Sequence, residues 1–154
     1  MSDLVIRPGR DDDLEGLVTL WREYMGDGYH ELVNMKWSEQ NTVKWRTFAR
    51  YYISQGLFLV AEEKGSVIGF ISLNICSPPF ETIYQCAEVI DIYVAKIHRG
   101  KGYGRRLLRH VMSFLKDRGI EVVTLSVLTS NKEALRLYRE EGFEEVFYTL
   151  KKKL

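Results

Sequence analysis

One stretch of the chain constrains its fold more than any other. A strand-like run, AEVIDIYV at residues 87–94, leads through HRGKGYG at 98–104 into a helix whose apolar positions are Leu107, Leu108, Val111, Met112 and Leu115. EVVTLSVL, at 121–128, has strand character again, and a helical pattern over 131–141 follows it. A strand, a helix and a further strand in this order predict a right-handed crossover with parallel strands. The chain is therefore predicted to be an α/β protein.

The remaining patterns add mainly antiparallel structure. The run at 3–9 predicts a strand that Pro8 and Gly9 close, and helical spacing follows Asp11–Asp13 up to the glycines of GDG at 26–28. A second helix is predicted from about 38 to 54, where Gly56 stops it. Strands are predicted at 57–63 and 66–75, and a last one at 144–154. Together with the crossover, these runs predict one mixed domain over residues 1–154.

Composition and charge exclude several classes of protein. A chain of 154 residues fits a single domain and buries roughly 70% of its unfolded surface. Lysine and arginine total 22 against 21 aspartates and glutamates, a balance that does not favour a nucleic-acid partner. No apolar run has the length of a signal peptide core or a membrane span, so we expect a cytoplasmic protein with no membrane partner.

Cysteine and histidine give no sign of a metal site. The three histidines, His30, His98 and His110, are scattered, and Cys76 and Cys86 match no zinc spacing, so no metal is predicted. The two cysteines flank a predicted hairpin, so a bridge between the strands is geometrically allowed. Two free, partly buried thiols are the favoured interpretation.

The glycines at 100, 102 and 104 lie between a strand end and a helix start. Glycine there lets the backbone approach a ligand and direct several N–H groups to one point, while the helix end adds about half a positive charge. Such a nest suits an anion, most plausibly a phosphate. The alternative is a turn that only connects two elements. The P-loop pattern is absent, and a dinucleotide motif needs glycine where Arg105 or Leu107 stands.

Two segments resemble one known family. RGKGYG, at 99–104, is similar to the Arg/Gln-x-x-Gly-x-Gly/Ala signature of the GNAT superfamily of N-acetyltransferases. NKEALRLYREEGF, at 131–143, resembles that family's Asn-x-x-Ala-x-x-x-Tyr-x-x-x-Gly-Phe segment. The resemblance covers nearly the whole chain. It implies a GNAT-like α/β (α+β) fold, with a mixed, largely antiparallel, twisted sheet of about six to seven strands, about four flanking helices and a parallel β-α-β crossover.

The resemblance also implies acetyl-CoA as co-substrate and a set of residues that bind it. Backbone N–H groups of the glycine segment would hold the pyrophosphate, and the amide of Val94 would polarise the thioester carbonyl. Lys101, Arg105 and Arg106 either add charge or are ordinary solvated residues. Asn131 has two interpretations, a helix cap and a pantetheine contact, and both can hold at once. The implied cofactor-binding residues are Ile92, Tyr93, Val94, Arg99, Gly100, Lys101, Gly102, Tyr103, Gly104, Arg105, Asn131, Ala134 and Tyr138.

Transfer to an amine requires two proton movements. Tyr138 matches the family tyrosine that protonates or hydrogen-bonds the departing thiolate, although a tyrosine on an inner helix face also serves as core. An ammonium with a pKa near 10.4 is neutral roughly once in 2,500 molecules at pH 7, so a base is the larger need.

Two carboxylates in the strand at 87–94 are candidates for that base. Glu88 and Asp91 are three residues apart, which places them on opposite faces of a regular strand unless a bulge redirects one. Glu88 is favoured, because it has the spacing of the catalytic glutamate in the histone-acetylating branch and would share a face with Ile90, Ile92 and Val94. Asp91 and a chain of water molecules are the alternatives.

The resemblance implies an acceptor side built by the first two helices, their connection and nearby strand ends. The segment to consider is therefore YMGDGYHELVNMKW, residues 24–37, with Tyr24, Asp27, Tyr29 and Glu31 as predicted substrate-binding residues. Carboxylates beside aromatic walls suit a cationic amine, although core aromatics and solvated charges explain the same composition. The predicted function is transfer of an acetyl group from acetyl-CoA to a primary amine by direct attack in a ternary complex, with a small-molecule amine favoured. A protein lysine or N-terminus as acceptor, and an inactive acyl-CoA-binding regulator, are the alternatives. The family resemblance also implies a homodimer.

Overall fold

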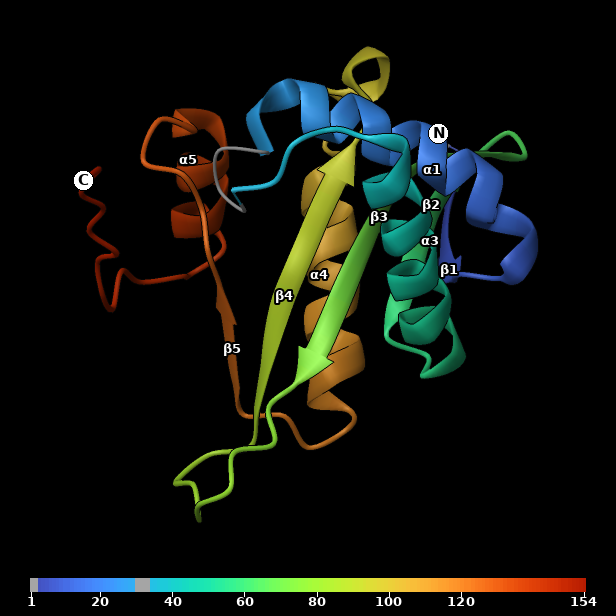
Figure 1. The fold of residues 1–154 in the computed structure, drawn as a ribbon. Coiled ribbons are helices and arrows are strands. Elements are labelled where there is room, and N and C mark those ends of the chain that lie inside the picture. The colour runs from blue at the N-terminus through green and yellow to red at the C-terminus, as the bar shows by residue number, and fades with distance from the viewer. Residues whose placement is uncertain (1–2, 30–33) are drawn as a thin grey trace.

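The computed structural model describes residues 3–29 and 34–154 and builds them around one sheet (Figure 1). In this part of the chain the sheet has five strands in sequence order: β1 (Leu4–Pro8), β2 (Phe58–Glu63), β3 (Ser66–Ile75), β4 (Cys86–Val94) and β5 (Val122–Leu125). The first four strands pair antiparallel, and β5 pairs parallel to β4. The predicted parallel crossover is thus confirmed.

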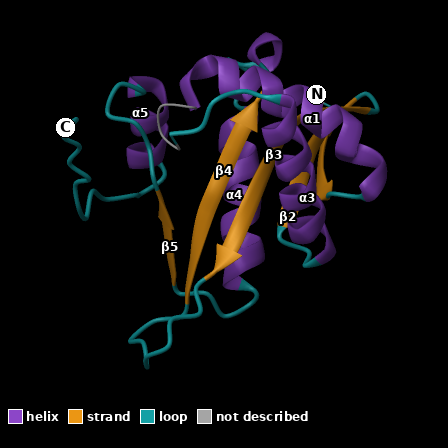
Figure 2. Cartoon of the chain, in the orientation of Figure 1, coloured by secondary structure: helices purple, strands orange, loops and turns teal. Residues whose placement is uncertain are grey.

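Helices cover both faces of the sheet (Figure 2). Two of them, α1 (Leu14–Tyr24) and α3 (Glu39–Ser54), pack on one face, and α4 (Tyr103–Lys116) packs on the other. A fourth, α5 (Lys132–Glu140), follows β5, and η1 (Asp11–Asp13), η2 (Met25–Tyr29) and η3 (Lys96–His98) are short helical segments. Among the described residues, no helix combines the length and apolar character that crossing a bilayer requires.

Each face of the sheet has its own core. Trp21 and Trp45 stack with ring centroids 5.4 Å apart on the face of α1 and α3, where Phe70 and Tyr93 also lie. On the other face, Leu107 and other apolar side chains of α4 form a core with apolar residues of β3 and β4. These strand residues are Ile68, Ile71, Leu73, Val89 and Val94. A side chain of β3 or β4 can therefore be assigned to a face from the core that it joins.

The strand predicted at 144–154 is wrong. All of these residues are described, none is in a strand, and Val146, Phe147 and Tyr148 are about three-quarters exposed. In Figure 1 the segment leaves the end of α5 and runs outward, away from β5. Apolar alternation makes a strand only where a neighbouring edge accepts its backbone hydrogen bonds, and this segment lies against no edge. Without this strand, the described part of the chain has a five-stranded sheet, fewer strands than the six to seven that the resemblance implies.

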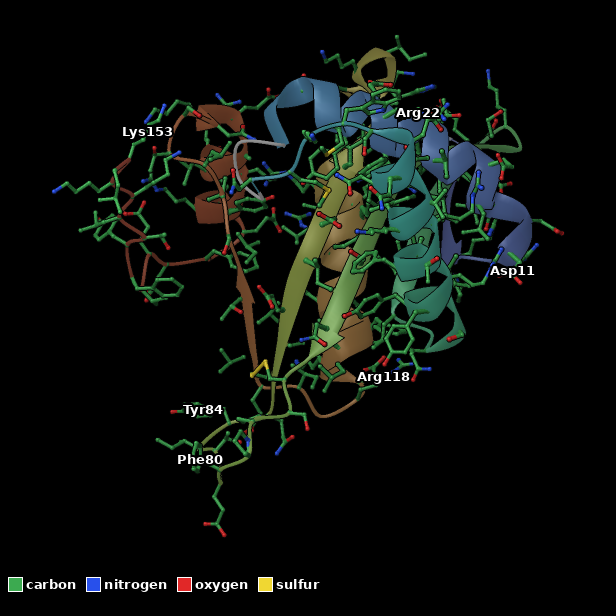
Figure 3. The ribbon with its side chains drawn as sticks, in the orientation of Figure 1. Asp11, Arg22, Phe80, Tyr84, Arg118 and Lys153 are labelled. Atoms are coloured by element: carbon green, nitrogen blue, oxygen red, sulfur yellow. A yellow bond between two sulfur atoms is a disulfide. The ribbon has the colours of Figure 1, made fainter. Side chains whose placement is uncertain are left out.

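The expectation of two free thiols is also wrong. Cys76 and Cys86 form a disulfide at the base of the β3–β4 connection, with their Cα atoms 5.3 Å apart. The antiparallel register brings Ile75 opposite Ala87, so the next positions outward face each other across the hairpin, at a distance that a disulfide spans. Figure 3 shows this bond and the loop beyond it, whose Phe80 and Tyr84 side chains are exposed to solvent.

Candidate active site

A cavity opens where β4 and β5 separate. The two strands pair only from Cys86 and Val122 to Val89 and Leu125, and β4 then continues to Val94 paired with β3 alone. The gap leads into a cavity of about 760 Å³, which the N-terminus of α4 and the inner face of α5 also line. The carboxyl ends of diverging parallel strands are a common place for ligands in α/β proteins. Here the gap provides that place.

The glycine segment forms one wall of this cavity. Gly100 and Gly102 both have φ of +76°, a left-handed conformation, and a Cβ atom at either would meet no other heavy atom within 4 Å. Gly102 is the N-cap of α4, and Arg106 N donates the first helical bond to its carbonyl at 3.0 Å. The N–H groups of the first turn precede that bond and have no partner within the helix. With the positive helix end, they fit a phosphate group.

Tyr138 enters the cavity from α5. Its side chain is 9% exposed, its ring lies 5.8 Å from that of Phe143, and burial raises the pKa of its phenol to about 12. The phenol is therefore neutral over the physiological range and can donate a hydrogen bond. Asn131 caps the same helix, because its Oδ1 accepts from Ala134 N at 3.1 Å. The predicted helix cap is confirmed.

Comparison with known proteins agrees with this geometry. The model of the acetyltransferase (GNAT) family matches residues 16–143. The chain belongs to the acetyltransferase (GNAT) family. By this membership it is an acetyltransferase, and the fold class predicted from the sequence is confirmed.

Several relatives and solved structures resemble this acetyltransferase. An uncharacterized N-acetyltransferase of Methanocaldococcus jannaschii is 28% identical over 141 residues, which are 91% of this chain and 60% of the relative. The putative phosphinothricin acetyltransferase YwnH of Bacillus subtilis is 26% identical over 148 residues, 92% of this chain and 85% of the relative. The PaiA N-acetyltransferase of Thermoplasma acidophilum, solved in complex with coenzyme A, has a TM-score of 0.69 and 25% identity, covering 92% of this chain and 90% of that one.

Most of the predicted site residues of the acetyltransferase meet in one place. All the predicted cofactor-binding residues except Lys101 line the cavity, and so do Tyr24 and Asp27 from the predicted acceptor segment. The Tyr29 side chain and Glu31 lie outside the described residues. Sequence reasoning did not find Ser126, Val127 and Leu128, which line the wall beyond β5. The position of this segment just after a parallel strand was the available signal.

The two candidate bases are arranged differently from the prediction. Ser72 pairs with Asp91 and Leu73 pairs with Val89, so Ile90 is an extra residue in β4, a β-bulge. Because side chains alternate between faces, the extra residue brings Glu88 and Asp91 to the same face.

That shared face is the one covered by α1 and α3, since Asp91 is two residues from Tyr93, which joins their core. The expectation of opposite faces, which holds for a regular strand, is wrong here because of the bulge that was named as its exception. Glu88 does not share a face with Ile92 and Val94, which pack toward α4. Asp91 is buried, with Ser72 Oγ 3.4 Å from its Oδ2, whereas Glu88 is exposed. Neither carboxylate lines the cavity.

The Asp27 carboxylate contacts two cationic side chains, those of Lys96 and Arg99. Its carboxylate lies 2.8 Å from Lys96 Nζ and accepts from Arg99 Nη2 at 2.7 Å. Burial acts to raise the pKa of Asp27, but these two hydrogen bonds outweigh it, and the pKa lies below its ordinary value. Arg99 also donates from Nε to the Val94 carbonyl at 2.9 Å. Asp27 thus fastens the segment before the glycines to η2, and its contact with an acceptor stays a prediction.

Arg105 bridges two helices. It contacts Glu140 and lies 2.5 Å from Glu141, and Arg109 contacts Glu141 at 2.8 Å. These pairs join α4 to α5, the helix that carries Tyr138. The Arg105 guanidinium is therefore already paired with carboxylates. It is not an ordinary solvated side chain, and it is not an unpaired cation beside the nest.

Proposed function

We propose that the chain transfers an acetyl group from acetyl-CoA to a primary amine by direct attack in a ternary complex, with a small cationic amine as acceptor. The observation that carries the proposal is the glycine nest at the start of α4, which opens on the same cavity as the buried hydroxyl of Tyr138. An anion site and a neutral proton donor in one cavity fit a thioester that also carries a pyrophosphate group. The PaiA structure, which holds coenzyme A in a similar fold, supports this choice of co-substrate.

Each wall of the cavity has a part in this proposal. The N–H groups around Gly102 hold the pyrophosphate, Asn131 and Ala134 contact the pantetheine arm, and the amide of Val94 polarises the thioester carbonyl. The separation of β4 from β5 leaves room for an extended arm between two strands. The acceptor approaches near Tyr24 at the other end of the cavity.

The pKa of Tyr138 decides how it assists the leaving group. A phenol of pKa about 12 is a weaker acid than a thiol, whose reference pKa is near 8.5. Full transfer of its proton to the thiolate would cost roughly 5 kcal/mol, because each pKa unit corresponds to about 1.4 kcal/mol. Tyr138 therefore acts as a hydrogen-bond donor to the departing sulfur, and solvent supplies the proton.

The bulged β4 carries the residues that receive the proton of the amine. Glu88 and Asp91 face the same side, where two carboxylates attract an ammonium group. Because neither lines the cavity, a water molecule connects the amine to the carboxylate that accepts its proton. We favour Glu88 as that carboxylate because it is exposed and can pass the proton on to solvent.

A thiol-release assay tests the function. Purified protein receives acetyl-CoA with small cationic amines, with a lysine peptide, or with a peptide whose N-terminus is free. Release that depends on a small amine supports the proposal, and release with a peptide alone assigns a protein acceptor. Calorimetric binding of coenzyme A without release for any amine indicates a regulator, and absence of binding refutes the cofactor site.

A homodimer and a cytoplasmic location remain predictions. The disulfide counts against a cytoplasmic location, because such bonds persist mainly in oxidising compartments.

A further inference from the structure

A carboxylate from a distant strand, Glu63, also contacts the glycine segment. Glu63 is the last residue of β2, and its side chain is only 13% exposed. Its Oε1 accepts a hydrogen bond from the hydroxyl of Tyr103, the first residue of α4. Its Oε2 lies 2.9 Å from His98 Nδ1 and 3.9 Å from Lys101 Nζ. One carboxylate thus contacts residues before, between and after Gly100 and Gly102.

Two carboxylates contact the basic side chains of this segment. Asp27 contacts the two cations described above, and Glu63 contacts His98 and Lys101. The Tyr103 hydrogen bond is the largest influence that holds the pKa of Glu63 below its ordinary value. With the cations occupied, the backbone N–H groups are the donors best placed for a phosphate.

A negative charge so near an anion site has an electrostatic cost. Glu63 and the phosphates of a bound coenzyme A would repel each other, because like charges disfavour one another at short range. Its contacts offset that cost, since Tyr103 is 4% exposed and its hydroxyl has Glu63 as an acceptor. Two left-handed glycines leave the segment little conformational preference of its own. An external anchor is what such a segment needs to present its N–H groups in one direction.

We propose that Glu63 is a positioning residue for the cofactor site: through Tyr103 and His98 it holds the start of α4 and the glycine segment in the conformation that binds the pyrophosphate. It acts through these neighbours and touches neither substrate. The inference rests on the proposed function, in that the ligand of the nest is coenzyme A.

The sign of one binding measurement separates this role from a simple charge effect. Glu63→Gln removes a negative charge beside the nest, so electrostatics alone predicts tighter binding of coenzyme A, whereas loss of positioning predicts weaker binding. We expect a Kd roughly tenfold higher, the scale of one hydrogen bond to a charged group. The KM for acetyl-CoA should rise similarly while kcat at saturation changes little.

Glu62→Gln is the matched control. Glu62 is the adjacent residue of the same strand, but its carboxylate pairs with Arg7 at 2.7 Å instead of contacting the glycine segment. The substitution removes the same charge and should leave the Kd of coenzyme A unchanged. Tyr103→Phe keeps the buried ring and removes only the hydroxyl, so it should reproduce part of the Glu63→Gln loss. The double variant should lose less than the product of the two single effects, because both remove one interaction.

Titration calorimetry with coenzyme A, and thermal unfolding of each variant, decide the matter. Wild-type protein that binds no coenzyme A refutes the proposed function. Wild-type binding with an equal or lower Kd for folded Glu63→Gln refutes only the positioning role. Equal losses in Glu62→Gln and Glu63→Gln also overturn it, because they would indicate a general disturbance of the end of β2 and not the loss of the contacts that Glu63 makes. If Glu63→Gln does not fold, Tyr103→Phe takes its place, and an unchanged Kd in that variant refutes the proposal.

Discussion

Gly102 allows a sharp test of the nest, because α4 has a matched control at its other end. Gly102 has φ of +76° and Gly119, just beyond the helix, has φ of +78°. Neither has another heavy atom within 4 Å of the place where a Cβ atom would lie. Glutamate at either position meets the same backbone strain and open space. Only Gly102 borders the cavity.

The two effects of glutamate have different magnitudes. A left-handed conformation costs a non-glycine residue about 1–2 kcal/mol, which lowers the Tm of a domain of this size by about 2–8 °C. This loss should be similar for Gly102→Glu and Gly119→Glu. A carboxylate about 5 Å from a phosphate adds roughly 3 kcal/mol of repulsion at an effective dielectric constant near 20. Gly102→Glu alone should therefore raise the Kd of coenzyme A roughly a hundredfold or more.

Calorimetric titration at a temperature well below both Tm values measures this difference. We expect Gly119→Glu to bind as the wild type does, and Gly102→Glu to bind too weakly to saturate. A folded Gly102→Glu variant with wild-type affinity would remove the basis for placing pyrophosphate at the start of α4. Equal losses of affinity in both variants would assign the effect to backbone strain and not to the nest.

Three further perturbations test the chemistry and the fold. Tyr138→Phe should lower kcat about 10- to 100-fold, the scale of one hydrogen bond to a charged group, with an unchanged Kd for coenzyme A, and an unchanged kcat would leave the tyrosine only a packing role. Because a phenol of pKa about 12 stays protonated, wild-type kcat should show no loss from ionisation of Tyr138 up to about pH 11. Glu88→Gln should lower kcat/KM at neutral pH, and the deficit should shrink as the pH rises toward the pKa of the amine near 10.4; the same rescue in Asp91→Asn alone would move the base to Asp91. Replacing Cys76 and Cys86 by serine opens a loop with a sequence separation of 10. The free energy of unfolding should fall by roughly 2.5–3 kcal/mol and the Tm by about 5–10 °C, and an unchanged thermal unfolding curve would contradict this.

Local sequence alone determined the elements around the cavity. Helical spacing and glycines at a helix start are properties of neighbouring residues, so residues 98–115 suffice to predict α4 and its start directly after the glycines. The binding of pyrophosphate by this segment stays a prediction. The Asn131 cap and the inward position of Tyr138 follow in the same way from the period of one helix. The parallel crossover also needs only the order of three consecutive elements.

Tertiary structure decided what depends on residues far apart in the chain. The bulge at Ile90 exists because β3 and β4 change register there, and the pattern of one strand does not reveal its partner's register. Arg99 donates a hydrogen bond to Asp27, which is 72 positions away in the chain. Tyr103 donates one to Glu63, which is 40 positions away. The segment at 144–154 has the alternation of a strand, but a strand forms only against an edge that accepts its hydrogen bonds. Local propensity therefore places the residues that are predicted to bind the cofactor, whereas contacts across the sheet decide which face the carboxylates occupy and which cations are already paired.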